Sequence, residues 1–157
     1  MNESVVDRFF HAFRRRDGEA MASCYHPRAV FRDPVFGRLE GERIGAMWRM
    51  LTSGASALEV TVLGTMVEGD RGWARWVAVY PFGATARVVR NEVRSEFEFD
   101  HDLVIVQEDA FSFPAWARQA LGGAAIPFAW LPVYRRRVSS VANAQLDRFL
   151  AGGAGQA

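Results

Sequence analysis

The sequence predicts an α+β fold in which helices cover one face of an antiparallel sheet. Three observations support this prediction. Apolar side chains recur mainly at helical spacing over residues 4–52, alternate with period two over 57–111, and return to helical spacing over 112–151. With no internal repeat and no long linker, residues 1–151 are expected to form one domain and residues 152–157 a disordered tail.

The N-terminal third is mostly helical in pattern. A first helix is expected to begin at the capping residue Ser4 and to carry apolar residues through Phe13. Asp17 can cap a second, short helix, which His26-Pro27 ends.

A short strand and a third helix follow. The strand spans 29–33 and is stopped by Pro34, and Gly37 and Gly41 bracket a turn. Residues 42–52 then place apolar side chains on one helical stripe.

Four long strands are expected in the middle of the chain, joined by hairpin links rich in Gly and Asp: 57–68, 72–82, 87–99 and 103–111. In the third strand, charged residues from Arg90 to Glu98 alternate with a mainly apolar set that includes Asn91 and Ser95. One face of the sheet should therefore be exposed to solvent, and the other should face a core or cavity.

Helices close the chain. Ser112 can cap a short helix that ends at Gly122-Gly123, and Pro132 can begin a long last helix. The apolar stretch 124–131 between them could cover the mouth of a pocket, dock a second subunit or, less favoured, contact a membrane surface.

Composition excludes several kinds of chemistry. All 19 basic residues are Arg, so Schiff-base chemistry on a Lys and a phosphate-binding loop ending in Gly-Lys are excluded. Cys24 is the single cysteine, and no His pair has metalloprotease spacing. A net charge of +1 argues against nucleic acid, and no apolar run is long enough to span a membrane. We expect a cytoplasmic protein that uses no metal or cofactor and has no membrane as partner.

The segment 25–34, followed by Gly41 opening a helix, resembles the nuclear transport factor 2-like superfamily. Its members include SnoaL-like polyketide cyclases, ketosteroid isomerases and limonene epoxide hydrolases, and the resemblance covers about residues 4–116. It implies a cystatin-like cone, in which a curved antiparallel sheet wraps around N-terminal helices and an apolar pocket, here with extra C-terminal helices. It also implies a homodimer formed through the outer sheet face.

Two aspartates occupy positions that matter in this superfamily. Asp33 matches the proton-abstracting Asp of the steroid isomerases, whereas Phe9 and Ser95 match their two oxyanion donors. Asp109 matches an acid on the last strand of the epoxide hydrolases and some cyclases. The nearest match to the Arg of the hydrolases is Arg75, and their second acid is missing.

Physical reasoning about the residues leads to the same two aspartates. Asp33 precedes a Pro, which favours extended backbone, and apolar neighbours would raise its pKa towards the range of a general base or acid. A turn-forming Asp is the alternative. Asp109 lies among apolar residues and needs a partner, either in a site or in a structural pair with Arg75 or the Ser112 helix.

We therefore expect Asp33 and Asp109 to be catalytic. The residues expected to bind substrate are Asn91, Trp48, Phe9, Ser95, Phe111, Arg75 and Trp116. The resulting hypothesis is cofactor-free isomerisation, cyclisation or hydrolysis of a small hydrophobic oxygen-containing molecule. The alternatives are a non-catalytic dimeric module that binds an apolar ligand and a purely structural dimerisation domain.

Overall fold

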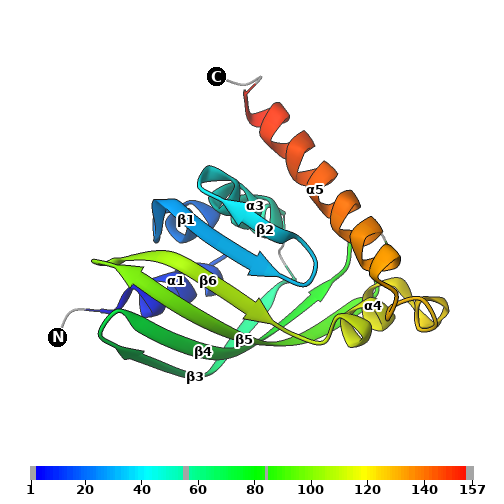
Figure 1. The fold of residues 1–157 in the computed structure, drawn as a ribbon, viewed down its shortest axis with the longest axis horizontal. Helices are drawn as coiled ribbons and strands as arrows, with labels where there is room; N and C mark the ends of the chain where they lie inside the picture. The colour runs from blue at the N-terminus through cyan, green and yellow to red at the C-terminus, as the bar shows by residue number, and fades with distance from the viewer. Residues whose placement is uncertain (1–2, 55–56, 84, 155–157) are drawn as a thin grey trace.

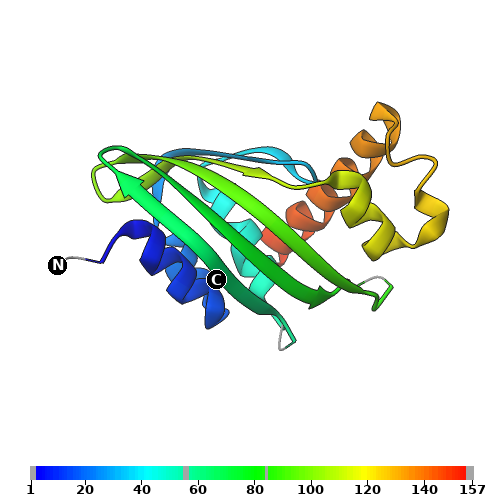
Figure 2. The same ribbon diagram turned by 90° about the horizontal axis from the view of Figure 1, so that it is seen from below.

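A curved six-stranded sheet with helices packed on one face forms the body of the protein (Figures 1 and 2), which confirms the predicted α+β class. The computed structural model describes residues 3–54, 57–83 and 85–154. The strands are β1 (Tyr25–Asp33), β2 (Gly37–Glu40), β3 (Glu59–Glu68), β4 (Arg71–Pro81), β5 (Val88–Asp100) and β6 (Leu103–Ala110). The helices are α1 (Val5–Arg14), α2 (Gly18–Ala22), α3 (Glu42–Thr52), α4 (Phe113–Leu121), the short 3₁₀ turn η1 (Gly123–Ala125) and α5 (Pro132–Ala154).

The four long strands β3 to β6 form the predicted antiparallel meander. The complete strand order is β2-β1-β6-β5-β4-β3, and β1 pairs with β6 in parallel. The sheet is therefore mixed rather than antiparallel throughout. This parallel pair brings together the carboxyl ends of two strands that lie far apart in the sequence.

Two local differences from the sequence prediction concern β1 and β2. The segment expected to be a turn between Gly37 and Gly41 forms β2, whose buried Leu39 lies opposite Phe31. The first strand begins at Tyr25, where the end of a helix was expected, and its register against β6 shifts before Val30. A Pro in this stretch cannot donate to the ladder, which explains the irregular pairing.

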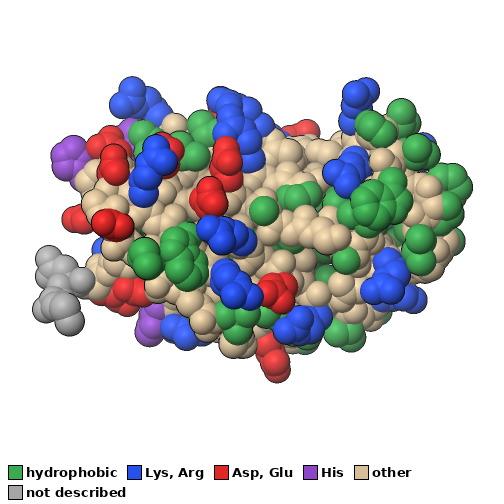
Figure 3. Space-filling view, turned by 60° about the horizontal axis from the view of Figure 1, so that its bottom comes forward, with side chains coloured by type: hydrophobic (Ala, Val, Ile, Leu, Met, Phe, Trp, Pro, Cys, Tyr) green, Lys and Arg blue, Asp and Glu red, His purple; other side chains and the backbone are tan. Residues whose placement is uncertain are grey.

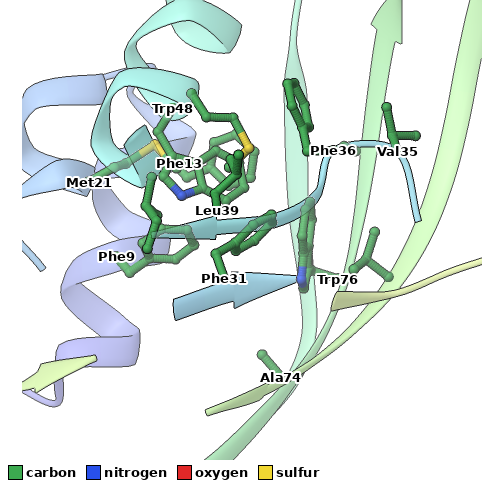
Figure 4. Packing of buried hydrophobic residues seen from close by; sticks show 14 of the residues in the cluster. Phe9, Phe13, Met21, Phe31, Val35, Phe36, Leu39, Trp48, Ala74 and Trp76 are labelled. Atoms are coloured by element: carbon green, nitrogen blue, oxygen red, sulfur yellow. The ribbon is translucent and has the colours of Figure 1, made fainter. Parts of the chain in front are cut away.

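The inner face of the sheet is covered by α1, α2 and α3 (Figure 2). Ser4 caps α1 as predicted, because its side chain accepts a hydrogen bond from the backbone N–H of Asp7. Aromatic rings fill the space between helices and sheet (Figure 4). The ring centroids of Phe9 and Trp48 lie 5.4 Å apart, and Phe13 contacts Trp76 at 5.3 Å.

The C-terminal helices extend beyond this core (Figure 1). In α5, the side chain of Asn143 donates to the backbone carbonyl of Phe36, and Arg43 of α3 pairs with Asp147 at 2.7 Å. The helix continues to Ala154, past the position where the sequence predicted a disordered tail; residues 155–157 lie outside the described residues. None of the helices among the described residues combines the length and apolar character needed to cross a membrane.

Candidate functional site

Two carboxylates lie side by side where β1 and β6 end. In the parallel register, Phe31 is the partner of Gln107 and Arg32 the partner of Glu108. Arg32 and Glu108 are exposed and form an ion pair at 2.8 Å on the outer face. The next residues, Asp33 and Asp109, therefore point to the inner face on neighbouring strands, which are spaced about 4.8 Å apart.

The turn after β1 fixes the Asp33 carboxylate. Its Oδ1 accepts hydrogen bonds from the backbone N–H groups of Val35 at 2.9 Å and Phe36 at 2.5 Å. Burial raises the pKa of Asp33 to about 6, although these backbone hydrogen bonds oppose the shift. Asp33 thus forms a turn and also carries a shifted pKa, so the two interpretations of this residue are compatible.

Asp109 is buried and bonded through one oxygen. Its Oδ1 accepts hydrogen bonds from the hydroxyl group of Ser95 at 2.5 Å and from Nε2 of Gln107 at 2.9 Å. Burial raises the pKa of Asp109 to about 7; the two hydrogen bonds oppose the shift, and the charge of Asp33 adds to it. The two carboxylates therefore influence each other's protonation.

A buried hydrogen-bonded network orients the two donors to Asp109. Trp48 donates from Nε1 to the hydroxyl group of Tyr25 at 2.8 Å, and that hydroxyl donates to Oε1 of Gln107 at 2.5 Å. The amide of Gln107 is thereby held with its NH₂ group towards Asp109. On the other side, Trp76 donates from Nε1 to Oγ of Ser95 at 2.8 Å.

The second oxygen of Asp109 has no hydrogen-bond partner among the described residues. Both hydrogen bonds to this carboxylate end on Oδ1, yet no fully buried side-chain oxygen or nitrogen among the described residues lacks a partner. Oδ2 is therefore not completely buried. Asp33 and Asp109 are also among the residues around a hollow of about 420 Å³, together with Pro34 and Phe111, but this hollow opens on the outer face, opposite the face to which the two carboxylates point.

The rest of the hollow is charged. It is bounded by Arg32, Arg94, Glu96 and Glu108, all exposed residues of β1, β5 and β6. Its lining is thus more polar than the apolar pocket that the sequence predicts. A ligand in this hollow would therefore meet mainly the charged side chains of the outer face.

Tyr80 is a polar residue of the inner face. It lies opposite the buried Val89 and accepts a hydrogen bond from Nε1 of Trp116 at 3.0 Å. Burial raises the pKa of Tyr80, and the charge of Asp33 raises it further. Trp116, on α4, therefore contacts a tyrosine that lies within the electrostatic range of Asp33.

The remaining predicted site residues fall into separate places. Phe9 and Trp48 are buried in the aromatic core (Figure 4) and do not line the hollow. Asn91 lies half-buried on the inner face opposite Ala78. Arg75 lies on the outer face and pairs with Glu92 at 2.9 Å, so its expected pairing with Asp109 is not formed.

Gln107, Tyr25, Trp76 and Tyr80 were not among the predicted site residues. Period-two alternation places Gln107 on the same face as Asp109 and could have indicated it. The other contacts join separate elements of the fold. Among the described residues, no three His, Cys, Asp or Glu side chains gather as ligands for a metal ion.

Comparisons with known proteins agree with this architecture. The model of the SnoaL-like domain family matches residues 6–107, a range that includes Asp33 and ends just before Asp109. A search of curated proteins finds no significant match.

Solved structures with the same fold have low sequence identity to this chain. A hypothetical protein from Catenulispora acidiphila with a ketosteroid isomerase-like fold, in complex with trimethylamine, has a TM-score of 0.67 and 14% identity over 84% of this chain and 100% of its own. A limonene epoxide hydrolase-like enzyme from M. tuberculosis has a TM-score of 0.63 and 20% identity, over 79% and 92%. A polyketide cyclase, so described provisionally, from Pseudomonas putida has a TM-score of 0.64 and 13% identity, over 75% and 98%. These similarities show a shared fold.

Proposed function

Since this chain belongs to the SnoaL-like domain family, we propose that it catalyses cofactor-free acid–base chemistry on a small, hydrophobic, oxygen-containing molecule, with Asp33 and Asp109 as the reacting groups. The main support is the pair of adjacent inward-facing carboxylates, both with pKa values raised by burial. Paired acids whose environments push their pKa values apart supply an acid and a base at the same pH.

The hydrogen bonds suggest which aspartate takes which role. The charge of Asp33 raises the pKa of Asp109, whereas backbone N–H groups stabilise the anion of Asp33, so we expect Asp109 to keep a proton when Asp33 has lost its own. Oδ1 of Asp109 accepts two hydrogen bonds, so the proton belongs on Oδ2, which has no hydrogen-bond partner among the described residues. Asp33 is then the general base, and protonated Asp109 is the group that donates to a substrate oxygen.

The position of Asp109 also offers a replacement for a missing donor. In the steroid isomerases, a protonated carboxylic acid donates to the substrate oxygen, and Ser95 matches its position. Ser95 lies directly opposite Asp109 in the sheet, and its hydroxyl hydrogen is already used in the bond to Asp109. In this protein, the donating carboxylic acid would thus be Asp109 on β6, in place of a residue at the position of Ser95 on β5.

Two reactions fit this pair. Next to a carbonyl group, Asp33 would take a proton from carbon while Asp109 donates to the carbonyl oxygen, and the enol would then isomerise or cyclise. With an epoxide, Asp33 would take a proton from water as the water oxygen bonds to carbon, and Asp109 would protonate the departing epoxide oxygen. Phe111 would contact the apolar part of either substrate.

Proton transfer can be tested without knowing the natural substrate. Deuterium incorporation into small cyclic ketones in D₂O would be followed by NMR, and diol formation from a limonene-type epoxide by mass spectrometry. We expect Asp33→Asn and Asp109→Asn to reduce turnover by about a hundredfold or more, whereas the exposed control Asp70→Asn keeps the wild-type rate. Wild-type rates in both aspartate variants would refute the proposal.

A non-catalytic dimeric module that binds an apolar ligand is the second candidate. It is favoured by Phe9, which offers no hydroxyl group, and by Ser95, whose hydroxyl hydrogen is occupied. This candidate predicts that ketones or epoxides bind without conversion. Calorimetry would then give the same affinity for Asp33→Asn as for the wild type.

A further inference from the structure

The C-terminal part of the chain has a charge balance unlike that of the whole. The protein contains 19 Arg and 18 acidic residues, but residues 110–146 contain four Arg and no Asp or Glu. Figure 3 shows hydrophobic and basic side chains together at the end of the molecule formed by α4 and the start of α5, and acidic ones elsewhere on this face. This end is therefore both basic and apolar.

Large apolar side chains project from the segment 126–133, which we call the apolar tip. Trp130 is 71% exposed, Val133 74% and Phe128 52%, and Ile126 and Leu131 are also about half exposed. The backbone of the tip is nevertheless anchored. Ala129 is fully buried, its carbonyl accepts from Nε of Arg135, and the guanidinium group of Arg135 lies 5.0 Å from the ring centroid of Phe113.

The exposed side of α5 continues the same character. Arg136 and Arg137 follow Val133 at helical spacing, and Val141 lies one turn after Arg137, so these residues share one face. All four are exposed. Neither Arg136 nor Arg137 forms an ion pair with any residue in the described ranges. We call Val133, Arg136, Arg137 and Val141 the basic face of α5.

We propose that the apolar tip and the basic face of α5 together bind the surface of an anionic lipid bilayer. Trp, Phe and Leu side chains partition into the boundary between headgroups and acyl chains, and Arg side chains pair with lipid phosphates. A second copy of this chain is a poorer occupant, because a symmetric contact would place this surface, which has Arg residues and no acidic residue between 110 and 146, against itself. Because no described helix spans a membrane, the binding would be peripheral.

This proposal departs from the expectation, drawn from the sequence, that no membrane is a partner. The overall charge of +1 hides the local excess of Arg that the fold displays on one end. The proposal is independent of the proposed acid–base function, since it uses none of the residues around Asp33 and Asp109.

Vesicle flotation with the full chain tests the proposal. We expect the protein to float with phosphatidylcholine vesicles that contain about 30% phosphatidylglycerol, to stay unbound with pure phosphatidylcholine, and to be released by high salt. The tryptophan fluorescence of the protein, to which five Trp residues contribute, should shift to the blue with anionic vesicles, and this shift should be absent in Trp130→Phe.

Matched variants separate the two contributions. Phe128→Ser/Trp130→Ser should abolish flotation, whereas Leu63→Ser/Met66→Ser, which changes two exposed apolar residues of β3, should not. Arg136→Gln/Arg137→Gln should weaken binding by about tenfold or more, whereas Arg14→Gln/Arg15→Gln should leave it unchanged. Circular dichroism would verify that each variant is folded.

Three outcomes would overturn the proposal. The first is a failure of the wild type to float with anionic vesicles, and the second is an equal loss of flotation in the control variants. The third is a wild-type dimer in analytical ultracentrifugation that dissociates on Phe128→Ser/Trp130→Ser while no vesicles are bound, which would make the apolar tip a subunit interface.

Discussion

Ser95 on β5 lies directly opposite Asp109 on β6, and its hydroxyl group donates a 2.5 Å hydrogen bond to Oδ1 of that carboxylate. This bond and the one from Gln107 lower the pKa of Asp109 only in part, because burial dominates and leaves it at about 7. The site therefore holds a proton at a pH where an exposed Asp would have lost it.

Stability should fall as the pH rises through the acidic range. An exposed Asp carboxyl group has an ordinary pKa of 3.8, whereas Asp33 and Asp109 have pKa values of about 6 and about 7 in the fold, so the folded state binds more protons between these limits. For each of the two groups, the free energy of unfolding should fall by up to about 1.4 kcal/mol for every unit that the pH rises between the ordinary pKa and the pKa in the fold. Urea unfolding at several pH values would measure this slope.

The variant Asp109→Asn isolates one of the two groups. An Asn can still accept the hydrogen bonds from Ser95 and Gln107 but has no proton to lose. The difference in unfolding free energy between variant and wild type should therefore grow in favour of the variant from about pH 4 to pH 7. A difference that is constant with pH would contradict the raised pKa.

The rate of proton exchange should have a bell-shaped dependence on pH. Activity should rise as Asp33 loses its proton near pH 6 and fall as Asp109 loses its own near pH 7, with both apparent pKa values belonging to the coupled pair. In the residual activity of Asp109→Asn, the fall at higher pH should be missing. The control Asp70→Asn should keep both limbs of the profile.

Removing the Tyr25 hydroxyl group should destabilise the fold. In Tyr25→Phe, Nε1 of Trp48 and Oε1 of Gln107 lose their partner inside the core. We expect a loss of about 1–3 kcal/mol in the free energy of unfolding, measured with urea. The half-buried Tyr134, whose hydroxyl group has no hydrogen bond among the described residues, provides the control Tyr134→Phe, and an equal loss there would exclude the network as the cause.

Gly18 should not tolerate a side chain. A Cβ atom there would lie 2.5 Å from Oγ1 of Thr52 and 2.7 Å from Cα of Arg49, because α2 and α3 pack closely. We expect Gly18→Ala to lower stability by about 1–3 kcal/mol in thermal or urea unfolding. Gly152→Ala in α5, where a Cβ meets nothing within 4 Å, should be neutral or stabilising by up to about 1 kcal/mol.

Local signals were sufficient for most of the fold. The Ser4 cap, the apolar stripe of 42–52 and the period-two strands each depend on neighbouring residues, and the structure forms all of them. The strand β2 and the parallel pairing of β1 with β6 depend on partners distant in sequence. A four-residue strand has too little pattern of its own to be told from a turn.

The site was only partly predictable for a similar reason. Period-two alternation correctly places Ser95 on the inner face, together with every second residue of β5. In β4, by contrast, Trp76, Val77 and Ala78 are all buried, so no clear alternation shows which face Tyr80 occupies. The hydrogen bond between Tyr25 and Gln107 joins two strands through the fold. No pattern within either strand indicates it.

The parallel pairing of β1 and β6 also has a consequence for the order of folding. Arg32 and Glu108, which form an ion pair across these strands, are 76 residues apart in the sequence. Such distant pairing is entropically expensive to nucleate, so the meander of β3 to β6, whose neighbours are linked by short turns, should form first. During synthesis, a nascent chain would carry Asp33 long before Asp109 emerges from the ribosome, and the pair could assemble only after that.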